Sequence, residues 1–180
     1  MEQWRNALQI CSILLRYPDQ SVTHYIDSIR QELESLPPHF KKRISDFIEY
    51  YTSRDIIQLQ EEYVETFDMN EKNSLYLTYH KAGEGENRGE DLLRIKNLYS
   101  LSNFSPQTSE LPDYLPLFLE FLSVADTKTA GQTIKLYSSY ISMIADNLKK
   151  CKSPYYMIFD ACIYVFSQIQ KGGKDHVFSS

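Results

Sequence analysis

The side chains of this 180-residue sequence that could do chemistry are carboxylates and aromatic rings, interleaved over one stretch. Residues 55–91 contain ten acidic and three basic side chains, a net charge of −7, whereas the rest of the chain sums to +2. The rings among and just beyond these acids are Tyr63, Phe67, Tyr76, Tyr79 and Tyr99. Tyrosine combines apolar area with a polar hydroxyl, which suits partly hydrated recognition surfaces. The pattern favours a groove for a segment that is both basic and apolar, such as an amphipathic helix.

Catalytic patterns are missing from the sequence. No glycine-rich phosphate loop follows a strand, and HExxH, cysteine-rich metal spacing and GxSxG are all absent. The four histidines are scattered at His24, His39, His80 and His176. We therefore expect no enzyme activity, no metal site and no cofactor. A triad assembled from distant residues leaves no local pattern, so a small all-α enzyme stays as an alternative.

Composition places the chain among soluble globular proteins of one domain. Apolar residues make up 42% and charged residues 24%, and six glycines with seven prolines leave few sites for chain reversal. Few turn-forming residues favour long helices over a many-stranded barrel. The formal charge of −5 speaks against nucleic acid as a partner, because such proteins cluster Lys and Arg.

Cysteine usage and hydropathy predict a cytoplasmic protein. The three cysteines, Cys11, Cys151 and Cys162, lack CxxC spacing and lie in apolar surroundings, so we expect reduced core residues. Glu2 and Arg5 interrupt the start of the chain before an apolar run develops, which disfavours a signal peptide. The most apolar stretch, residues 154–166, is too short to cross a bilayer, which needs about 20 residues.

Helical spacing of apolar residues recurs along the whole chain. We expect helices at 4–15, 22–36, 40–51, 56–67, 90–101, 113–125, 134–150 and 154–170, with loops at 81–89 and 102–110. The fold class is therefore all-α, a single-domain bundle of about seven to nine helices over residues 1–171. Residues 172–180, which include two glycines, are expected to form a flexible tail.

Two local assignments depend on turn chemistry and pairing. Residues 74–80 alternate like a strand, but no neighbouring segment offers a partner for the backbone groups, so we favour a helix. Asp113 is a good N-cap, and with it in that position Pro116 lies within the first helical turn, where its missing N–H costs nothing.

Four ordered motifs make the sequence recognisable. They are YVETFD at 63–68, NSLYLTY at 73–79, NRGEDLLRIKNLY at 87–99 and ELPDYLPLFLEFL at 110–122, preceded by LLRYPD at 14–19. Together they resemble the NarJ-type nitrate reductase assembly chaperones, or nitrate reductase delta subunits. That family belongs to a wider group of molybdenum oxidoreductase chaperones that includes TorD and DmsD.

The resemblance implies an all-α, cytoplasmic protein without a catalytic step. Such chaperones bind the N-terminal segment of the apo nitrate reductase catalytic (alpha) subunit and hold it competent for molybdenum cofactor insertion before membrane attachment. Proteins that deliver the cofactor are further partners to consider. The alternative from a different functional class is a helical adaptor that forms a homodimer through its apolar C-terminal helix.

Motif matches and charge together give the candidate residues for binding the client peptide. These are Glu61, Glu62, Tyr63, Glu65, Phe67, Asp68, Tyr76, Tyr79, Arg88, Tyr99, Asp113, Tyr114 and Glu120. Structural roles compete with binding at some of the matched positions. We expect Leu75, Leu77 and Leu111 in the core and Gly89 in a loop. Arg88 is expected to pair with Glu84, Asp91 or Asp113.

Overall fold

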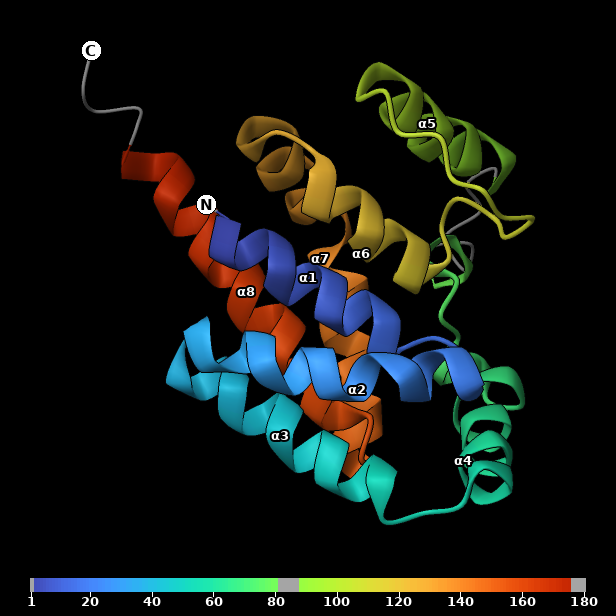
Figure 1. Ribbon diagram of the computed structural model, residues 1–180. Helices are drawn as coiled ribbons and strands as arrows, with labels where there is room; N and C mark the ends of the chain where they lie inside the picture. Colours follow the sequence, from blue (N-terminus) through green and yellow to red (C-terminus); the bar gives the residue numbers. More distant parts are fainter. Residues whose placement is uncertain (1, 81–87, 176–180) are drawn as a thin grey trace.

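The computed structural model describes the backbone of residues 2–80 and 88–175, and the side chains of residues 3–80 and 88–171. The described part contains eight α-helices packed as one bundle (Figure 1), which confirms the predicted all-α fold. The helices are α1 Glu2–Leu14, α2 Gln20–Glu32, α3 Pro38–Thr52, α4 Ile56–Tyr63, α5 Arg88–Leu101, α6 Leu115–Val124, α7 Thr127–Lys150 and α8 Tyr156–Asp175. Short 3₁₀ turns lie at Leu33–Ser35, Glu71–Asn73 and Leu77–Tyr79, and a π-helical turn spans Val64–Asp68.

The core is built around α8, which packs against α1, α3 and α7, while α1 also packs against α6. The apolar side chains of α8, such as Ile158, Phe159 and Val165, are fully buried in this core. The bundle covers much of the apolar face that the adaptor alternative would use, while Met157, Ile163 and Tyr164 of α8 remain partly exposed. No helix of the described residues is both long enough and apolar enough to span a membrane.

Carboxylate caps fix where three of the helices begin. The residue before each of these helices is an aspartate with an extended backbone: Asp19, Asp55 or Asp126. Its carboxylate accepts a hydrogen bond from a backbone N–H in the first turn of the helix. Since the first N–H groups of a helix have no partner within it, these caps satisfy donors that would otherwise need water.

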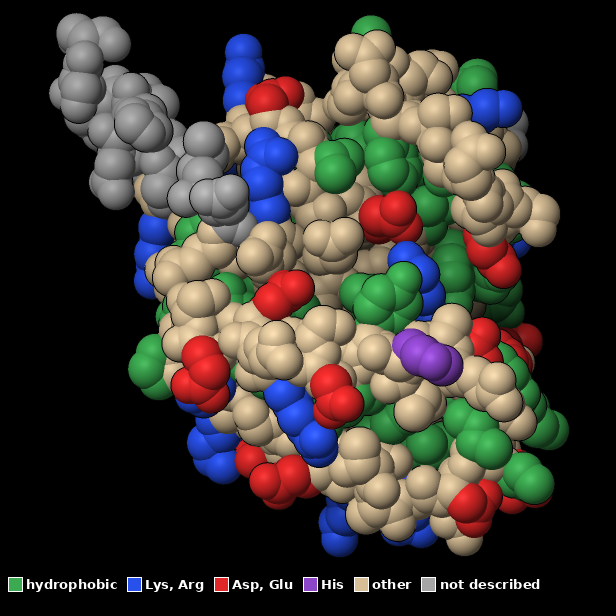
Figure 2. All heavy atoms as spheres, viewed as in Figure 1, with side chains coloured by type: hydrophobic (Ala, Val, Ile, Leu, Met, Phe, Trp, Pro, Cys, Tyr) green, Lys and Arg blue, Asp and Glu red, His purple; other side chains and the backbone are tan. Residues whose placement is uncertain are grey.

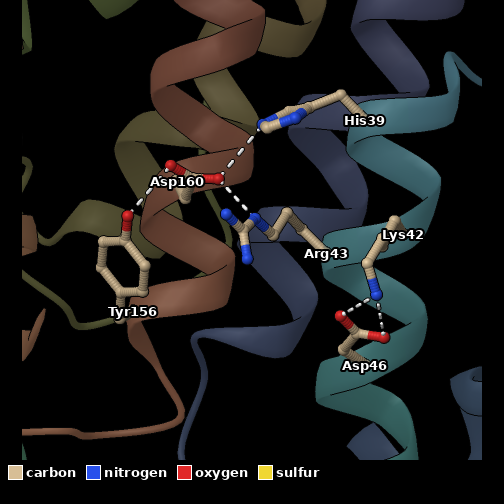
Figure 3. Close-up of polar contacts among 6 residues, drawn as sticks. All are labelled: His39, Lys42, Arg43, Asp46, Tyr156 and Asp160. Atoms are coloured by element: carbon tan, nitrogen blue, oxygen red, sulfur yellow. Dashed lines mark hydrogen bonds and ion pairs between the residues drawn. The ribbon is translucent and has the colours of Figure 1, made fainter.

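A charged cluster joins α3 to α8 (Figure 3). Asp160 of α8 accepts a 2.6 Å hydrogen bond from Nε of Arg43, and Nε2 of His39 lies 3.1 Å from the same carboxylate oxygen. The hydroxyl of Tyr156 donates to the other oxygen at 3.3 Å. On the face shown in Figure 2, charged side chains are scattered among other residues over α3, and hydrophobic side chains gather on the side of α4.

The expected boundaries need several corrections. Helix α5 begins at Arg88, so Gly89 is helical instead of lying in a loop, and residues 81–87 of that expected loop lie outside the described residues. Helix α8 continues to Asp175, five residues beyond its expected end, and residues 176–180 of the expected tail lie outside the described residues. Cys151 is exposed, unlike the two buried cysteines, because it follows the last turn of α7 at the surface.

Residues 74–80 are helical only in the 3₁₀ turn Leu77–Tyr79, and the N-cap assignment of Asp113 was wrong, both for one reason. Tyr76 forms an antiparallel β-bridge with Tyr114. The N–H of Leu77 donates to the carbonyl of Asp113 at 3.0 Å, and the N–H of Leu115 donates to the carbonyl of Leu75 at 2.8 Å. The missing partner of the extended segment is therefore the chain just before α6. The N-cap of α6 is Tyr114, without a side-chain cap bond, and the Asp113 carboxylate is engaged elsewhere.

Candidate functional site

A surface cavity of about 490 Å³ lies where the recognised motifs meet. Its lining comprises Tyr17, Tyr63, Phe67, Asp68, Ser74, Leu75, Tyr76, Tyr79, Arg88, Glu110, Leu111 and Tyr114. The wall thus combines the α1–α2 connection, the end of α4, the bridged segments around Tyr76 and Tyr114, and the start of α5. A site assembled from five stretches of chain depends on the whole bundle for its shape.

The π-helical turn Val64–Asp68 forms one wall of the cavity. Its hydrogen bond runs from the N–H of Met69 to the carbonyl of Val64 at 2.9 Å, an i→i+5 pattern that α-helices lack. A π-helical turn holds more residues than an α-helical turn, so Tyr63 and Asp68, which are five residues apart in sequence, lie about one turn apart. This local widening lets Tyr63, Phe67 and Asp68 line the same cavity.

Tyr63 links the cavity wall to the core. Its ring lies edge-on to Tyr17 and Phe67, with centroid distances of 5.5 and 5.0 Å. Its hydroxyl donates to the carbonyl of Leu15 at 3.0 Å and lies 3.0 Å from the hydroxyl of Tyr114. Burial raises the pKa of Tyr63 far above that of a free tyrosine, so the phenol is neutral at physiological pH. The ring is only 3% exposed, so it supports the cavity from behind.

Tyr76 and Tyr114 form a second ring pair in the lining, with centroids 5.4 Å apart. The hydroxyl of Tyr76 donates to the carboxylate of Glu110 at 2.8 Å. Burial and this hydrogen bond raise the pKa of Tyr76. Tyr79 is the open edge of the site, with 39% of its surface exposed.

Beneath the cavity, Asp113 ties three motifs together. Its carboxylate is fully buried and accepts hydrogen bonds from the backbone N–H of Thr78 at 3.0 Å and from the Thr78 hydroxyl at 2.6 Å. Arg88 donates from Nε to the Thr78 hydroxyl oxygen at 3.1 Å, and its Nη2 lies 3.8 Å from the Asp113 carboxylate. Of the partners expected for Arg88, Glu84 lies outside the described residues and Asp91 pairs with Arg94 at 3.8 Å. Asp113 is therefore a buried organiser of the site and not a helix cap.

The charge balance of the cavity is negative. Among the described residues, three charged side chains line it: Asp68, Glu110 and Arg88. Since Arg88 is paired with the buried Asp113, the two remaining carboxylates are not compensated by a base of the lining. Asp68 is exposed, but it loses part of its hydration in the cavity wall, and this partial desolvation raises the pKa of its carboxyl above the usual value.

The structure brings together seven of the thirteen candidate residues: Tyr63, Phe67, Asp68, Tyr76, Tyr79, Arg88 and Tyr114. The other six lie outside the lining. Glu61 and Glu65 are exposed on the outer surface, and Glu62 accepts a hydrogen bond from the hydroxyl of Tyr50. Glu120 pairs with Arg16 at 3.3 Å.

Tyr99 and Asp113 are the two remaining candidates, and both are buried. Tyr99 is 3% exposed and donates a 2.6 Å hydrogen bond to the carbonyl of Pro112. Burial raises the pKa of Tyr99, as it does for Tyr63. These two residues hold the segment before α6 in place and reach the cavity only through their neighbours.

Five lining residues were not among the candidates: Tyr17, Ser74, Leu75, Glu110 and Leu111. Each lies inside a motif that the sequence analysis quoted, so the motif boundaries were the available signal. Leu75 and Leu77 are buried as expected, but the expected burial of Leu111 was wrong, because 42% of its surface is exposed. Its position at the cavity rim explains that exposure.

Among the described side chains, no group of three or more His, Cys, Asp or Glu is placed to hold a metal ion.

Comparison with known proteins shows the family to which the chain belongs. The model of the family described as nitrate reductase delta subunit matches residues 33–160, most of the chain. The chain belongs to the nitrate reductase delta subunit family. The resemblance drawn from the motifs is thereby confirmed.

Relatives of this family cover most of the chain. A Bacillus subtilis protein named as a probable nitrate reductase molybdenum cofactor assembly chaperone NarJ is 36% identical over 145 residues, 80% of this chain and 79% of that protein. The nitrate reductase molybdenum cofactor assembly chaperone NarJ of Escherichia coli K12 is 28% identical over 156 residues, 85% of this chain and 66% of that protein. The chain thus spans slightly less than two thirds of the E. coli relative.

A solved structure supports the fold independently. The crystal structure of a proposed redox enzyme maturation protein from Archaeoglobus fulgidus superposes with a TM-score of 0.64, covering 94% of this chain and 93% of that one. Since the two sequences are 22% identical, the likeness concerns the arrangement of helices.

Proposed function

We propose that this protein is a cytoplasmic maturation chaperone for nitrate reductase. It binds the N-terminal segment of the apo catalytic (alpha) subunit and holds that subunit competent for molybdenum cofactor insertion before membrane attachment. Its relatives in B. subtilis and E. coli are named as nitrate reductase molybdenum cofactor assembly chaperones, which supports this role. The protein contributes binding and timing and carries out no chemical step.

One observation carries the proposal: the family motifs converge on a single open cavity that is lined with rings and negatively charged. Motifs that served packing alone would lie inside the core. Instead the side chains of Tyr79 and Leu111 remain about 40% exposed at its rim. A basic and apolar segment satisfies both properties, because its apolar side chains cover the rings while its cations meet the carboxylates.

Calorimetric titration with a synthetic peptide of the client's N-terminal segment tests this role. We expect saturable binding to the full chain, with an affinity that falls as salt rises, because the attraction between the charges is screened. Tyr79→Ala is the first variant to examine, because the side chain of Tyr79 is 39% exposed and its removal leaves the core intact. If Tyr79 anchors the peptide, its truncation to alanine should weaken the binding free energy by more than about 1 kcal/mol.

Tyr25→Ala is the matched control, because Tyr25 lies on α2 outside the cavity lining and is 47% exposed. The two variants should have similar stability, and only Tyr79→Ala should weaken peptide binding. If both variants bind the peptide equally well, the peptide does not bind at this cavity. In cells that lack this protein, we expect nitrate reductase to accumulate without its molybdenum cofactor, and fully loaded enzyme there would overturn the proposed function.

A further inference from the structure

Asp68 differs from the other charged side chains of the cavity. Glu110 accepts a hydrogen bond from Tyr76, and Arg88 is engaged by Thr78 and Asp113. Within the described part of the chain, Asp68 has neither an ion-pair partner nor a hydrogen-bond donor to its carboxylate. Asp68 is the last residue of the π-helical turn Val64–Asp68, and its side chain lines the cavity. A carboxylate held in this way has unused capacity for a cation.

The surroundings of Asp68 narrow the kind of cation. Tyr17, Tyr63, Phe67 and Tyr79 line the same cavity as Asp68, so a cation bound to its carboxylate has aromatic rings within the same site. A guanidinium group can stack on rings and bind a carboxylate with two N–H groups, and it is less strongly hydrated than an ammonium group. An ammonium group would keep more of its water and use the rings less well.

We infer that Asp68 and the rings beside it form a subsite for one arginine guanidinium of the bound client segment. This inference rests on the proposed function and specifies which client side chain the cavity selects. A volume of about 490 Å³ is that of a small-molecule pocket and exceeds the needs of one side chain. The remaining space, next to Leu75 and Leu111, accepts an apolar side chain one helical turn from the arginine.

In the free protein, ionisation of Asp68 is less favourable than in water, so a substitution at this position should affect stability and client binding differently. Because partial desolvation raises the pKa of Asp68, its ionised form is disfavoured by the fold, and neutralising the side chain should not lower stability. Asp68→Asn should therefore unfold at the same temperature as the unmodified protein or slightly higher, while binding the client more weakly. A carboxylate with a structural role would show the opposite pattern.

The decisive experiment is a double-mutant cycle with client peptides. Each arginine of the synthetic N-terminal peptide is replaced in turn by citrulline, a neutral isostere, and by lysine, and every peptide is titrated against the full chain and Asp68→Asn. At one arginine position, citrulline should weaken binding to the unmodified protein at least about tenfold and have almost no further effect in Asp68→Asn. Lysine at that position should restore only part of the loss.

Glu65→Gln is the matched control, since Glu65 lies in the same π-helical turn, is exposed and does not line the cavity. It should leave the citrulline effect unchanged. If the peptide binds but citrulline acts equally on the unmodified protein and Asp68→Asn at every position, the subsite is refuted while the proposed function stands. If no peptide binds, and cells without the protein still load nitrate reductase, both are refuted. Free arginine that binds as tightly as the peptide would replace the client segment with a small-molecule ligand.

Discussion

Replacing Asp113 by alanine tests whether the buried network under the cavity holds the site together. The substitution removes a fully buried carboxylate that accepts two hydrogen bonds from Thr78 and faces Arg88 at 3.8 Å. Hydrogen bonds to charged groups contribute about 1.5–3 kcal/mol each, and a buried N–H left without an acceptor is costly. The ion pair with Arg88 adds little to this sum, because the Arg88 side chain is 38% exposed. We therefore expect Asp113→Ala to lower the free energy of unfolding by about 3–5 kcal/mol.

The assay is urea unfolding followed by circular dichroism, in which stability is compared from midpoints at equal slope. Asp126→Ala is the matched control, because Asp126 is a true N-cap whose loss costs about 1 kcal/mol. For a chain of this size the melting temperature should fall by roughly 6–20 °C in Asp113→Ala and a few degrees in the control. Equal losses in the two variants would refute the reasoning, since Asp113 would then contribute no more than a cap.

Two further predictions concern stability and pH. Tyr63→Phe removes a hydroxyl with two hydrogen-bond partners but keeps the ring, so the free energy of unfolding should fall by about 1 kcal/mol while peptide affinity stays within about twofold. A large loss of affinity at unchanged stability would instead place the hydroxyl in contact with the client. A hydrogen bond from Thr129 lowers the pKa of Asp126, so this carboxylate stabilises the fold above its unfolded pKa, and the stabilisation is lost as pH falls through its folded pKa. Stability measured between pH 5 and 2 should accordingly fall less steeply in Asp126→Ala than in the unmodified protein, and parallel curves would contradict the prediction.

Two side chains that line the site are held by hydrogen bonds to the scaffold. Tyr63 donates to the backbone of the α1–α2 connection, and Arg88 is fixed by Thr78 and Asp113. Their orientation in the free protein is therefore set before a client arrives, which lowers the ordering cost of binding. The side chains left free to respond are the exposed rim residues Tyr79 and Leu111, together with Asp68.

Helices were predictable from the sequence because the signal for them is local. Apolar residues three and four positions apart fall on one helical face, so the stripes of α2, α3 and α7 could be read directly and lie within those helices. The family motifs were recognisable for the same reason, because each is a short contiguous stretch of sequence. Seven candidate residues at one cavity followed from those motifs and from the interleaving of rings with acids.

The arrangement of the site was decided by contacts between segments far apart in the chain. No local pattern states that Tyr76 pairs with Tyr114, and the missing partner led to a helix being favoured for residues 74–80. Asp113 resembles an N-cap in sequence, but its carboxylate is buried and accepts hydrogen bonds from the N–H and hydroxyl of Thr78. Periodicity specifies which face of an element is apolar, whereas the choice between core and cavity rim, as at Leu111, depends on what the rest of the bundle leaves uncovered. Tertiary packing alone made that choice.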